Sequence, residues 1–189
     1  MPSAAEKSGE NLVLNYHDAV VYQSDLELLD SNTAWLNDAC INFQMTRLQQ
    51  RHKNIVDLLF IDPSVISFMM HQCDDEDLAD LNQGLHLETK KRIFVPINDN
   101  YIVSADTFRR PGGGSHWSLL VILVVQSSGN QEQPLMCYHF DSGHGSNFRA
   151  ASAVADVFCS IFENCGGPGR VDMKECITPH QNNGYDCGI

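Results

Sequence analysis

The sequence predicts an α+β domain in which one sheet is flanked by helices. Two near-continuous apolar runs, 93–97 and 117–125, are typical of central strands. A further strand is predicted at 135–140, an Ala- and Val-rich helix at 147–162, and a short strand within 171–178. Because strands and helices are mixed along the chain without a regular alternation, their order favours the α+β class.

The first fifty residues predict a strand pair followed by two helices. Segments 12–16 and 19–22 are expected to pair as short strands. A Ser-Asp pair at 24–25 can cap a short helical turn. Asn37 or Asp38 can cap the next helix, which is expected to bury four apolar side chains: Ile41, Phe43, Met45 and Leu48.

The middle of the chain predicts two further helices and one long loop. Segment 56–61 fits either a strand or an irregular stretch, and the Asp-Pro pair at 62–63 opens a helix with Pro in its first turn. The acidic run 74–77 is typical of a solvated helix start, where carboxylates suit the dipole. Segment 99–115, which contains three consecutive glycines, is predicted to be a functional or disordered loop because it is so long.

The composition indicates a soluble globular protein. The 189 residues include 43% hydrophobic residues, enough for a sizeable core. We expect a mobile tail at 1–10 and a single domain at 11–189. With 12 basic and 24 acidic residues, the net charge is −12, which disfavours nucleic acid and anionic membranes as partners. The negative charge favours a protein partner with a basic face. We expect this chain to be a monomer.

The seven cysteines are expected to be mostly reduced, buried thiols. The count is odd, and the polar start of the chain lacks the basic flank and apolar run of a signal peptide. The longest apolar run, 119–125, is too short to span a bilayer. These features predict a protein of the cytoplasm, the nucleus or both.

Four residues could supply thiol-based acyl transfer, which needs a nucleophile, a base, an orienting group and oxyanion donors. His116 begins a predicted central strand and Asp141 ends the next one, so rigid elements would hold both beside loops. Cys187 follows a polar turn, and Gln181 together with the Cys187 backbone N–H could donate to an oxyanion. Taken singly, a structural His, a capping Asp and a buried thiol are the commoner explanations.

Four local sequence motifs give a more specific indication of function than the single residues do. They are Trp-Leu-Asn-Asp at 35–38, His-Trp-Ser-Leu at 116–119, Tyr-x-x-Asp-Ser at 138–142 and Gln-x-Asn-x-x-Asp-Cys-Gly at 181–188. In this order they resemble the sentrin-specific, or Ulp-type, cysteine protease family, over roughly residues 12 to 189. The resemblance implies a papain-like fold with a central mixed sheet flanked by helices, and processing of ubiquitin-like modifiers without metal or cofactor.

The resemblance also implies a role for each motif residue. Cys187 would be the nucleophile, His116 the general base and Asp141 its orienter, with Gln181 donating to the oxyanion. Three further residues would hold the Gly-Gly tail of the modifier. Trp35 and Trp117 would form the walls of a narrow tunnel, and Asp38 would hold the tail through hydrogen bonds. Without the resemblance, core packing is the simpler explanation for both tryptophans.

The surrounding sequence looks closest to the deneddylase branch, which acts on NEDD-type modifiers, with SUMO as the next choice. The supporting stretches are 23–30, 96–100, 113–121, 140–142 and 146–147. The loop 101–114 is longer than that branch usually has, so we expect substrate discrimination there. Precursor processing and isopeptide deconjugation both remain open.

The family continues past its catalytic Cys into a helix whose positive end activates the thiol. This sequence stops at Ile189. We therefore expect a chain that lacks its C-terminal helices, is poorly stable and is weakly active. The alternative function is an inactive form that binds a ubiquitin-like modifier without cutting it.

Two more functions fit the residues less well. Acyl transfer of another kind could use the same Cys, His and acid, although the tryptophan and Gln motifs favour a Gly-Gly tail. A zinc-stabilised module would draw on irregularly spaced residues without a Cys-x-x-Cys pair: Cys159, Cys165, Cys176, His180 or Cys187. His139 and His144 flank Asp141 and are expected to be structural or surface residues.

Overall fold

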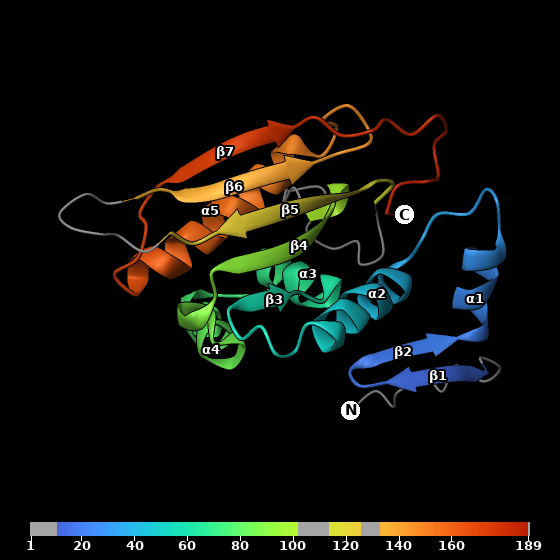
Figure 1. Ribbon diagram of the computed structural model, residues 1–189, viewed down its shortest axis with the longest axis horizontal. Helices are drawn as coiled ribbons and strands as arrows, with labels where there is room; N and C mark the ends of the chain where they lie inside the picture. The colour runs from blue at the N-terminus through green and yellow to red at the C-terminus, as the bar shows by residue number, and fades with distance from the viewer. Residues whose placement is uncertain (1–10, 102–113, 126–132, 189) are drawn as a thin grey trace.

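The main feature of the fold is a five-stranded mixed sheet (Figure 1). The computed structural model describes residues 11–101, 114–125 and 133–188. The spatial order of the strands is β3 (Leu58–Phe60), β4 (Arg92–Asn98), β5 (Trp117–Leu123), β6 (Leu135–Phe140) and β7 (Val171–Cys176). The three central strands are antiparallel, and the edge strands β3 and β7 run parallel to their neighbours.

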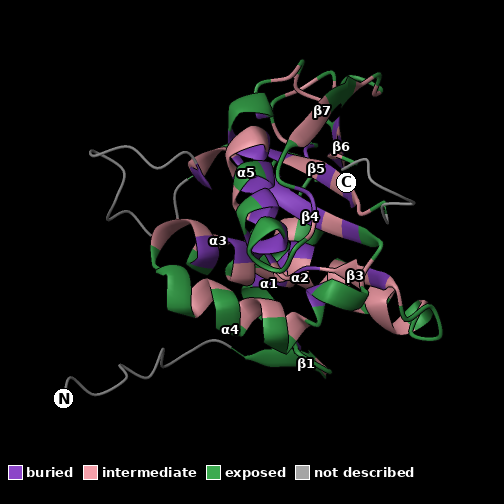
Figure 2. Cartoon of the chain, turned by 90° about the vertical axis from the view of Figure 1, so that its left-hand side faces the viewer, coloured by how far each residue is buried: buried purple, intermediate pink, exposed green. Residues whose placement is uncertain are grey.

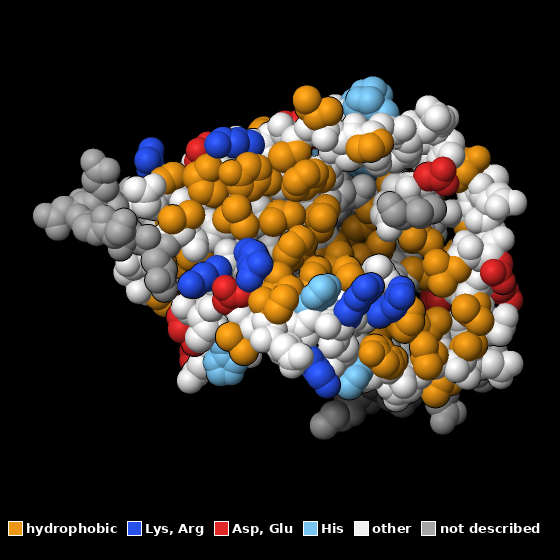
Figure 3. All heavy atoms as spheres, viewed as in Figure 1, with side chains coloured by type: hydrophobic (Ala, Val, Ile, Leu, Met, Phe, Trp, Pro, Cys, Tyr) orange, Lys and Arg blue, Asp and Glu red, His pale blue; other side chains and the backbone are white. Residues whose placement is uncertain are grey.

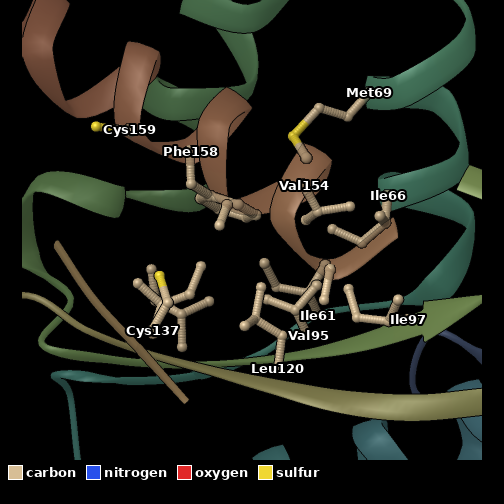
Figure 4. Packing of buried hydrophobic residues seen from close by; sticks show 14 of the residues in the cluster. Ile61, Ile66, Met69, Val95, Ile97, Leu120, Cys137, Val154, Phe158 and Cys159 are labelled. Atoms are coloured by element: carbon tan, nitrogen blue, oxygen red, sulfur yellow. The ribbon is translucent and has the colours of Figure 1, made fainter. Parts of the chain in front are cut away.

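Three helices cover one face of this sheet, namely α3 (Pro63–His71), α4 (Asp75–Leu85) and α5 (Phe148–Asn164). The core lies between them and the strands, where Figure 2 shows the buried residues gathered around α5. In Figure 4, Val154 and Phe158 of α5 and Ile66 of α3 point at the sheet. Short 3-10 helices follow α4 and β4, at Leu87–Thr89 and Asp99–Tyr101.

The opposite face of the sheet is also apolar, and Figure 3 shows hydrophobic side chains gathered there. On β5 the residues alternate, with Leu120 and Ile122 buried under α5 and Leu119, Val121 and Leu123 half-buried on the outer face. Apolar residues on both faces explain why the strand is apolar at every position except Ser118. No helix in the described part of the chain is long and apolar enough to cross a bilayer.

The N-terminal part forms a separate layer beside the sheet. A hairpin of β1 (Leu12–Tyr16) and β2 (Ala19–Tyr22) leads into α1 (Gln23–Asp30) and then α2 (Asp38–Arg51). Helix α2 packs against β2 and β3, and thereby joins the hairpin to the main sheet. Asn37 caps α2 by accepting a hydrogen bond from the Cys40 N–H at 3.0 Å.

Most predicted elements are confirmed, including the N-terminal strand pair, the Pro-initiated helix and the helix begun by the acidic run, which Asp74 caps. Of the four side chains that α2 was expected to bury, Ile41 is buried, whereas Phe43, Met45 and Leu48 are partly exposed. One prediction was wrong. The pair 24–25 does not precede its helix, because α1 already begins at Gln23. Asp25 lies inside the first turn and caps backwards, its carboxylate accepting the Tyr22 N–H at 2.8 Å.

Some predictions fall beyond what the structure describes. The expected tail at 1–10, most of the long loop (102–113) and Ile189 lie outside the described residues. The assignment of 11–189 to one domain stays a prediction.

Candidate active site

One cavity of about 540 Å³ opens between the N-terminal layer and the ends of β4 and β5. Its walls combine the start of α2, the start of β5 and the turn near the C-terminal end of the chain. Five of the seven predicted site residues line it, namely Trp35, Asp38, His116, Trp117 and Cys187. The fold therefore brings together residues separated by up to about 150 positions in sequence.

His116 and Asp141 form a tight pair at one side of the cavity. The Nε2 of His116 lies 2.5 Å from Oδ1 of Asp141, which directly follows β6 and is almost fully buried. With Nε2 engaged, Nδ1 is the ring nitrogen left for chemistry, and it has no hydrogen-bond partner among the described residues. The short contact supports the role predicted for Asp141 as the group that orients His116, and that role stays a prediction.

Hydrogen bonds keep Asp141 charged. Burial by itself would raise the pKa of Asp141, but His116 and two backbone N–H groups outweigh it and hold the pKa below its usual range. The backbone N–H groups are those of Gly143, at 2.7 Å, and Asn147, at 3.1 Å. A carboxylate that is ionised at neutral pH stabilises an imidazolium beside it, as a general base requires.

Cys187 lies at the apolar floor of the same cavity. Its side chain is 1% exposed and packs with Ile41 and Trp117. No hydrogen bond joins the Cys187 sulfur to His116 within the described part of the chain. In structures without substrate, catalytic hydrogen bonds are often long and tighten only when substrate binds. The predicted nucleophile and the predicted base thus line the same cavity without a direct hydrogen bond.

Gln181 does not reach the cavity wall. Its Oε1 accepts the Ser142 hydroxyl at 2.6 Å and its Nε2 donates to the Asn183 carbonyl at 2.7 Å. These bonds join the loop that carries Cys187 to the loop after Asp141. The role of Gln181 as an oxyanion donor stays a prediction, because both ends of its amide are bonded to loop residues outside the cavity.

The two tryptophans have different environments. Trp117 is 5% exposed and donates its indole N–H to the Leu36 carbonyl at 2.9 Å, so core packing and a cavity wall both describe it. Trp35 is 49% exposed, which excludes core packing. Its indole donates to the Gly184 carbonyl at 2.6 Å and so stands at the rim beside the Cys187 loop.

Sequence reasoning missed two residues that shape this region. Asp25 lines the cavity although it is 4% exposed, and its carboxylate accepts the Asn37 side-chain N–H at 2.6 Å. Asn147 is fully buried behind His116 and Asp141. The available signal for Asn147 was its place at the start of a predicted helix, which by itself suggests only a cap.

No cysteine belongs to a potential metal cluster in the described residues. All seven cysteines are free thiols, four of them buried, as predicted. The one cluster of suitable geometry in the described chain consists of His139, Asp141 and Glu175, and both ring nitrogens of His139 already have partners. His139 is thus structural and His144 is an exposed residue stacked on His180, as expected.

Comparisons with curated proteins give consistent relatives, although no protein-family model matches the chain. It is 33% identical to the probable sentrin-specific protease 8 of Dictyostelium discoideum, over 94% of this chain and 71% of that protein. It is 32% identical to NEDD8-specific protease 1 of Arabidopsis thaliana, over 96% and 73%. For human sentrin-specific protease 8 the identity is 33%, over 94% and 76%.

Solved structures share the fold. A de-sumoylating protease superposes with a TM-score of 0.67 and 17% identity, over 96% of this chain and 69% of that one. The Xanthomonas campestris effector XopD, bound to ubiquitin, gives a TM-score of 0.56 and 24% identity, over 84% and 70%. The central mixed sheet flanked by helices is thus common to these structures and this chain.

Proposed function

The chain belongs to the sentrin-specific, or Ulp-type, family of cysteine proteases, and from this we propose that it cleaves the bond after the C-terminal Gly-Gly of a ubiquitin-like modifier. The observation that supports this most directly is the His116–Asp141 pair at 2.5 Å, on the cavity that also holds Cys187. Base, orienter and nucleophile are the minimum for thiol acyl transfer.

The reaction follows from these groups. Nδ1 of His116 takes the Cys187 proton, and the thiolate attacks the carbonyl carbon of the terminal glycine. The tetrahedral oxyanion collapses, the C–N bond breaks, and the amine leaves with the proton from His116. Water, deprotonated by His116, then attacks the thioester carbonyl. The C–S bond breaks, the Cys187 thiolate takes the proton back from His116, and the modifier carboxylate is released. Asp141 remains ionised and stabilises the imidazolium throughout.

The cavity walls suit a tail without side chains. Trp35 at the rim and Trp117 at the floor are large, flat groups that would confine an extended Gly-Gly segment. Asp38, the first residue of α2, also lines the cavity and could accept hydrogen bonds from the tail backbone. A bulky side chain at either glycine position would be excluded by the same walls.

We favour a NEDD8-type modifier and place SUMO next. The support is that relatives from Arabidopsis thaliana and Schizosaccharomyces pombe are named NEDD8-specific proteases. The chain also spans 71% and 76% of the sentrin-specific protease 8 relatives from Dictyostelium discoideum and human, at 33% identity to each. Most of the length of those relatives therefore has a counterpart in this chain.

A second candidate is binding without cleavage. Two observations favour it: Cys187 and His116 are not hydrogen-bonded to each other within the described chain, and the Gln181 amide donates to Asn183. Substrate binding would have to draw these groups together for catalysis.

Hydrolysis and binding of the same modifiers separate the two candidates. We expect release of a fluorophore from the C-terminus of NEDD8 and slower or no release from SUMO and ubiquitin. The Cys187→Ala variant should bind NEDD8 as tightly as the wild type and release nothing. Binding by both proteins with no turnover by the wild type would establish the second candidate, and neither binding nor turnover would exclude both.

A further inference from the structure

A chain of buried hydrogen bonds lies behind His116 and Asp141, and its central residue is Asn147. We propose that Asn147 is a positioning residue that holds His116 and the Asp141 carboxylate in place relative to each other. Hydrogen bonds through Ser118, His139 and Glu175 help to orient its side-chain amide. The proposal rests on the proposed function, because it concerns the base and orienter of that reaction. None of the four network residues lines the cavity that holds Cys187, as far as the structure describes its walls.

Asn147 contacts both members of the pair. Its backbone N–H donates to Oδ2 of Asp141 at 3.1 Å, and its side-chain Nδ2 donates to the backbone carbonyl of His116 at 3.1 Å. Nδ2 also lies 3.2 Å from the carbonyl of Ile97, at the end of the neighbouring strand β4. A single buried residue therefore fixes the Asp141 carboxylate relative to the main chain of His116.

Asn147 gives up its ordinary structural role to do this. It occupies the N-cap position of α5, where an Asn side chain usually accepts a backbone N–H of the first turn. Within the described helix that capping bond is absent, and the side chain turns toward His116 instead. A cap of this kind contributes about 1 kcal/mol to helix stability. The alternative use of the side chain indicates that position matters here.

The outer part of the network fixes which way the amide points. Oε2 of Glu175 lies 2.7 Å from Nδ1 of His139, and a carboxylate only accepts, so Nδ1 carries the proton. In the neutral ring Nε2 must then accept, and it lies 2.9 Å from the Ser118 hydroxyl, which donates. The Ser118 oxygen is left as an acceptor.

Nδ2 of Asn147 lies 3.1 Å from this Ser118 oxygen. Its two hydrogens thus face three acceptors, those of Ser118, His116 and Ile97. A reversed amide would place its oxygen against two carbonyl oxygens, which is repulsive. The two carbonyl oxygens, together with the Ser118 oxygen that the relay from Glu175 leaves as an acceptor, therefore specify one orientation of the Asn147 side chain.

This arrangement is retained at a cost in stability. Oδ1 of Asn147 is buried and has no hydrogen-bond partner among the described residues. His139 is 0% exposed, although histidine is usually partly exposed. An unsatisfied buried acceptor costs about 1–3 kcal/mol. An unsatisfied buried group calls for an explanation, and the groups next to this one are those of the His116–Asp141 pair.

The primary test replaces Asn147 and measures kcat and KM separately. For Asn147→Ala we expect kcat to fall roughly 10- to 100-fold, because misplacement by about 1 Å can cost that much. KM should change less than about twofold, since Asn147 does not touch the cavity. The matched control is Val154→Ala, which shortens a buried side chain of the same helix α5 without touching the network.

Two further variants test the relay. Ser118→Ala removes the acceptor that faces Asn147, whereas Ser118→Thr keeps the hydroxyl. We expect the Ala variant to lose about fivefold in kcat, the equivalent of one neutral hydrogen bond, and the Thr variant to recover most of it. Rates are taken per mole of folded protein, so that lower stability alone does not change them.

A readout without turnover separates this proposal from the proposed function. Nitrogen-15 NMR of the imidazoles should show His116 protonated at Nε2 in the wild type and in Val154→Ala, and mixed tautomers in Asn147→Ala. An inactive wild type with this NMR result would overturn the protease assignment and leave the positioning role standing. If Asn147→Ala matches Val154→Ala in kcat and in tautomer, or changes KM alone, the positioning role is wrong.

Discussion

The indole N–H of Trp35 donates to the carbonyl of Gly184 over 2.6 Å, between residues 149 positions apart. This bond fastens the segment before α2 to the loop that carries Cys187. Because Trp35 is 49% exposed, the contact can form and break without disturbing the core.

Replacing Trp35 should therefore act on the site more than on stability. Trp35→Phe keeps an aromatic wall but removes the N–H, and we expect kcat/KM to fall about fivefold, the equivalent of one neutral hydrogen bond. Trp35→Ala should lose more, because the wall is gone as well. Steady-state kinetics on a NEDD8 conjugate measure this. The control is Phe68→Leu, which replaces an exposed aromatic residue of α3 that does not line the cavity. Equal kinetics for Trp35→Ala and the wild type would contradict the role of Trp35.

Asp141→Asn should leave the fold intact and remove most of the activity. The amide is nearly isosteric but carries no charge to stabilise an imidazolium, and it can present an N–H to His116. We expect kcat to fall by roughly 10²- to 10⁴-fold. Asp172→Asn, on strand β7 away from the cavity, is the matched control. A loss of activity of similar size in both variants would point to folding instead.

The stability of the chain should fall in acid through Asp141. The pKa of Asp141 is lower in the folded state than the ordinary value of about 3.9. Its contribution is therefore complete above the unfolded pKa and is lost as pH falls through the folded pKa. Denaturant titrations between pH 7 and pH 3 measure this. The difference in unfolding free energy between wild type and Asp141→Asn should shrink toward the acid end, and a constant difference would refute the linkage.

Substitution by alanine should lower turnover at one glycine and raise the stability of the chain at another. A Cβ on Gly143 would lie 2.6 Å from Nε2 of His116 and 2.7 Å from Cε1, so Gly143→Ala must displace the ring and lower kcat by about tenfold or more. Gly84 lies inside α4, and no described atom comes within 4 Å of a new Cβ there. Gly84→Ala should stabilise the chain by about 0.5–1 kcal/mol with unchanged kinetics. Thermal melts and kinetics on both variants check this pair; unaltered turnover in Gly143→Ala would show that His116 can move freely.

The cysteines should differ in their reactivity toward a maleimide. Cys165 is exposed, whereas Cys137 is fully buried, and burial raises the pKa of Cys137 to about 12. Thiolates react and thiols do not, so Cys165 should be labelled in the folded protein and Cys137 only after unfolding. Peptide mass spectrometry after timed labelling reads this directly. Early labelling of Cys137 would mean that the sheet opens under native conditions.

Local sequence patterns were enough to predict most of the fold and the candidate pair. Continuous apolar runs predicted β4 and β5, and the motifs around His116 and Asp141 placed both at strand ends. The sequence did not decide whether 56–61 is a strand or irregular, and both descriptions apply in part, because only Leu58–Phe60 pairs with β4. The α1 start was mistaken because Asp25 caps from inside the helix, a pattern that resembles a conventional cap in sequence.

Contacts between distant residues could not be predicted in the same way. The His139–Glu175 bond depends on the parallel register of β6 and β7, in which these two residues are direct partners. Nothing in either local sequence encodes that register. Likewise, the Ser142–Gln181 bond arises where two loops meet, and it turns an amide away from the place that its motif suggests.

The walls of the cavity are drawn from positions 20–39, 98, 114–117 and 187. Contacts of such long sequence separation form late in folding, since the chain entropy lost in closing large loops must be offset by packing already in place. A partly folded chain would then hold its helices and sheet before it holds a working site. In refolding experiments, turnover should return after the far-ultraviolet circular dichroism signal; simultaneous recovery would argue against this order. Until His116 and Cys187 are brought onto the same cavity, the thiol has no base to activate it, so a partly folded chain should not hydrolyse substrate.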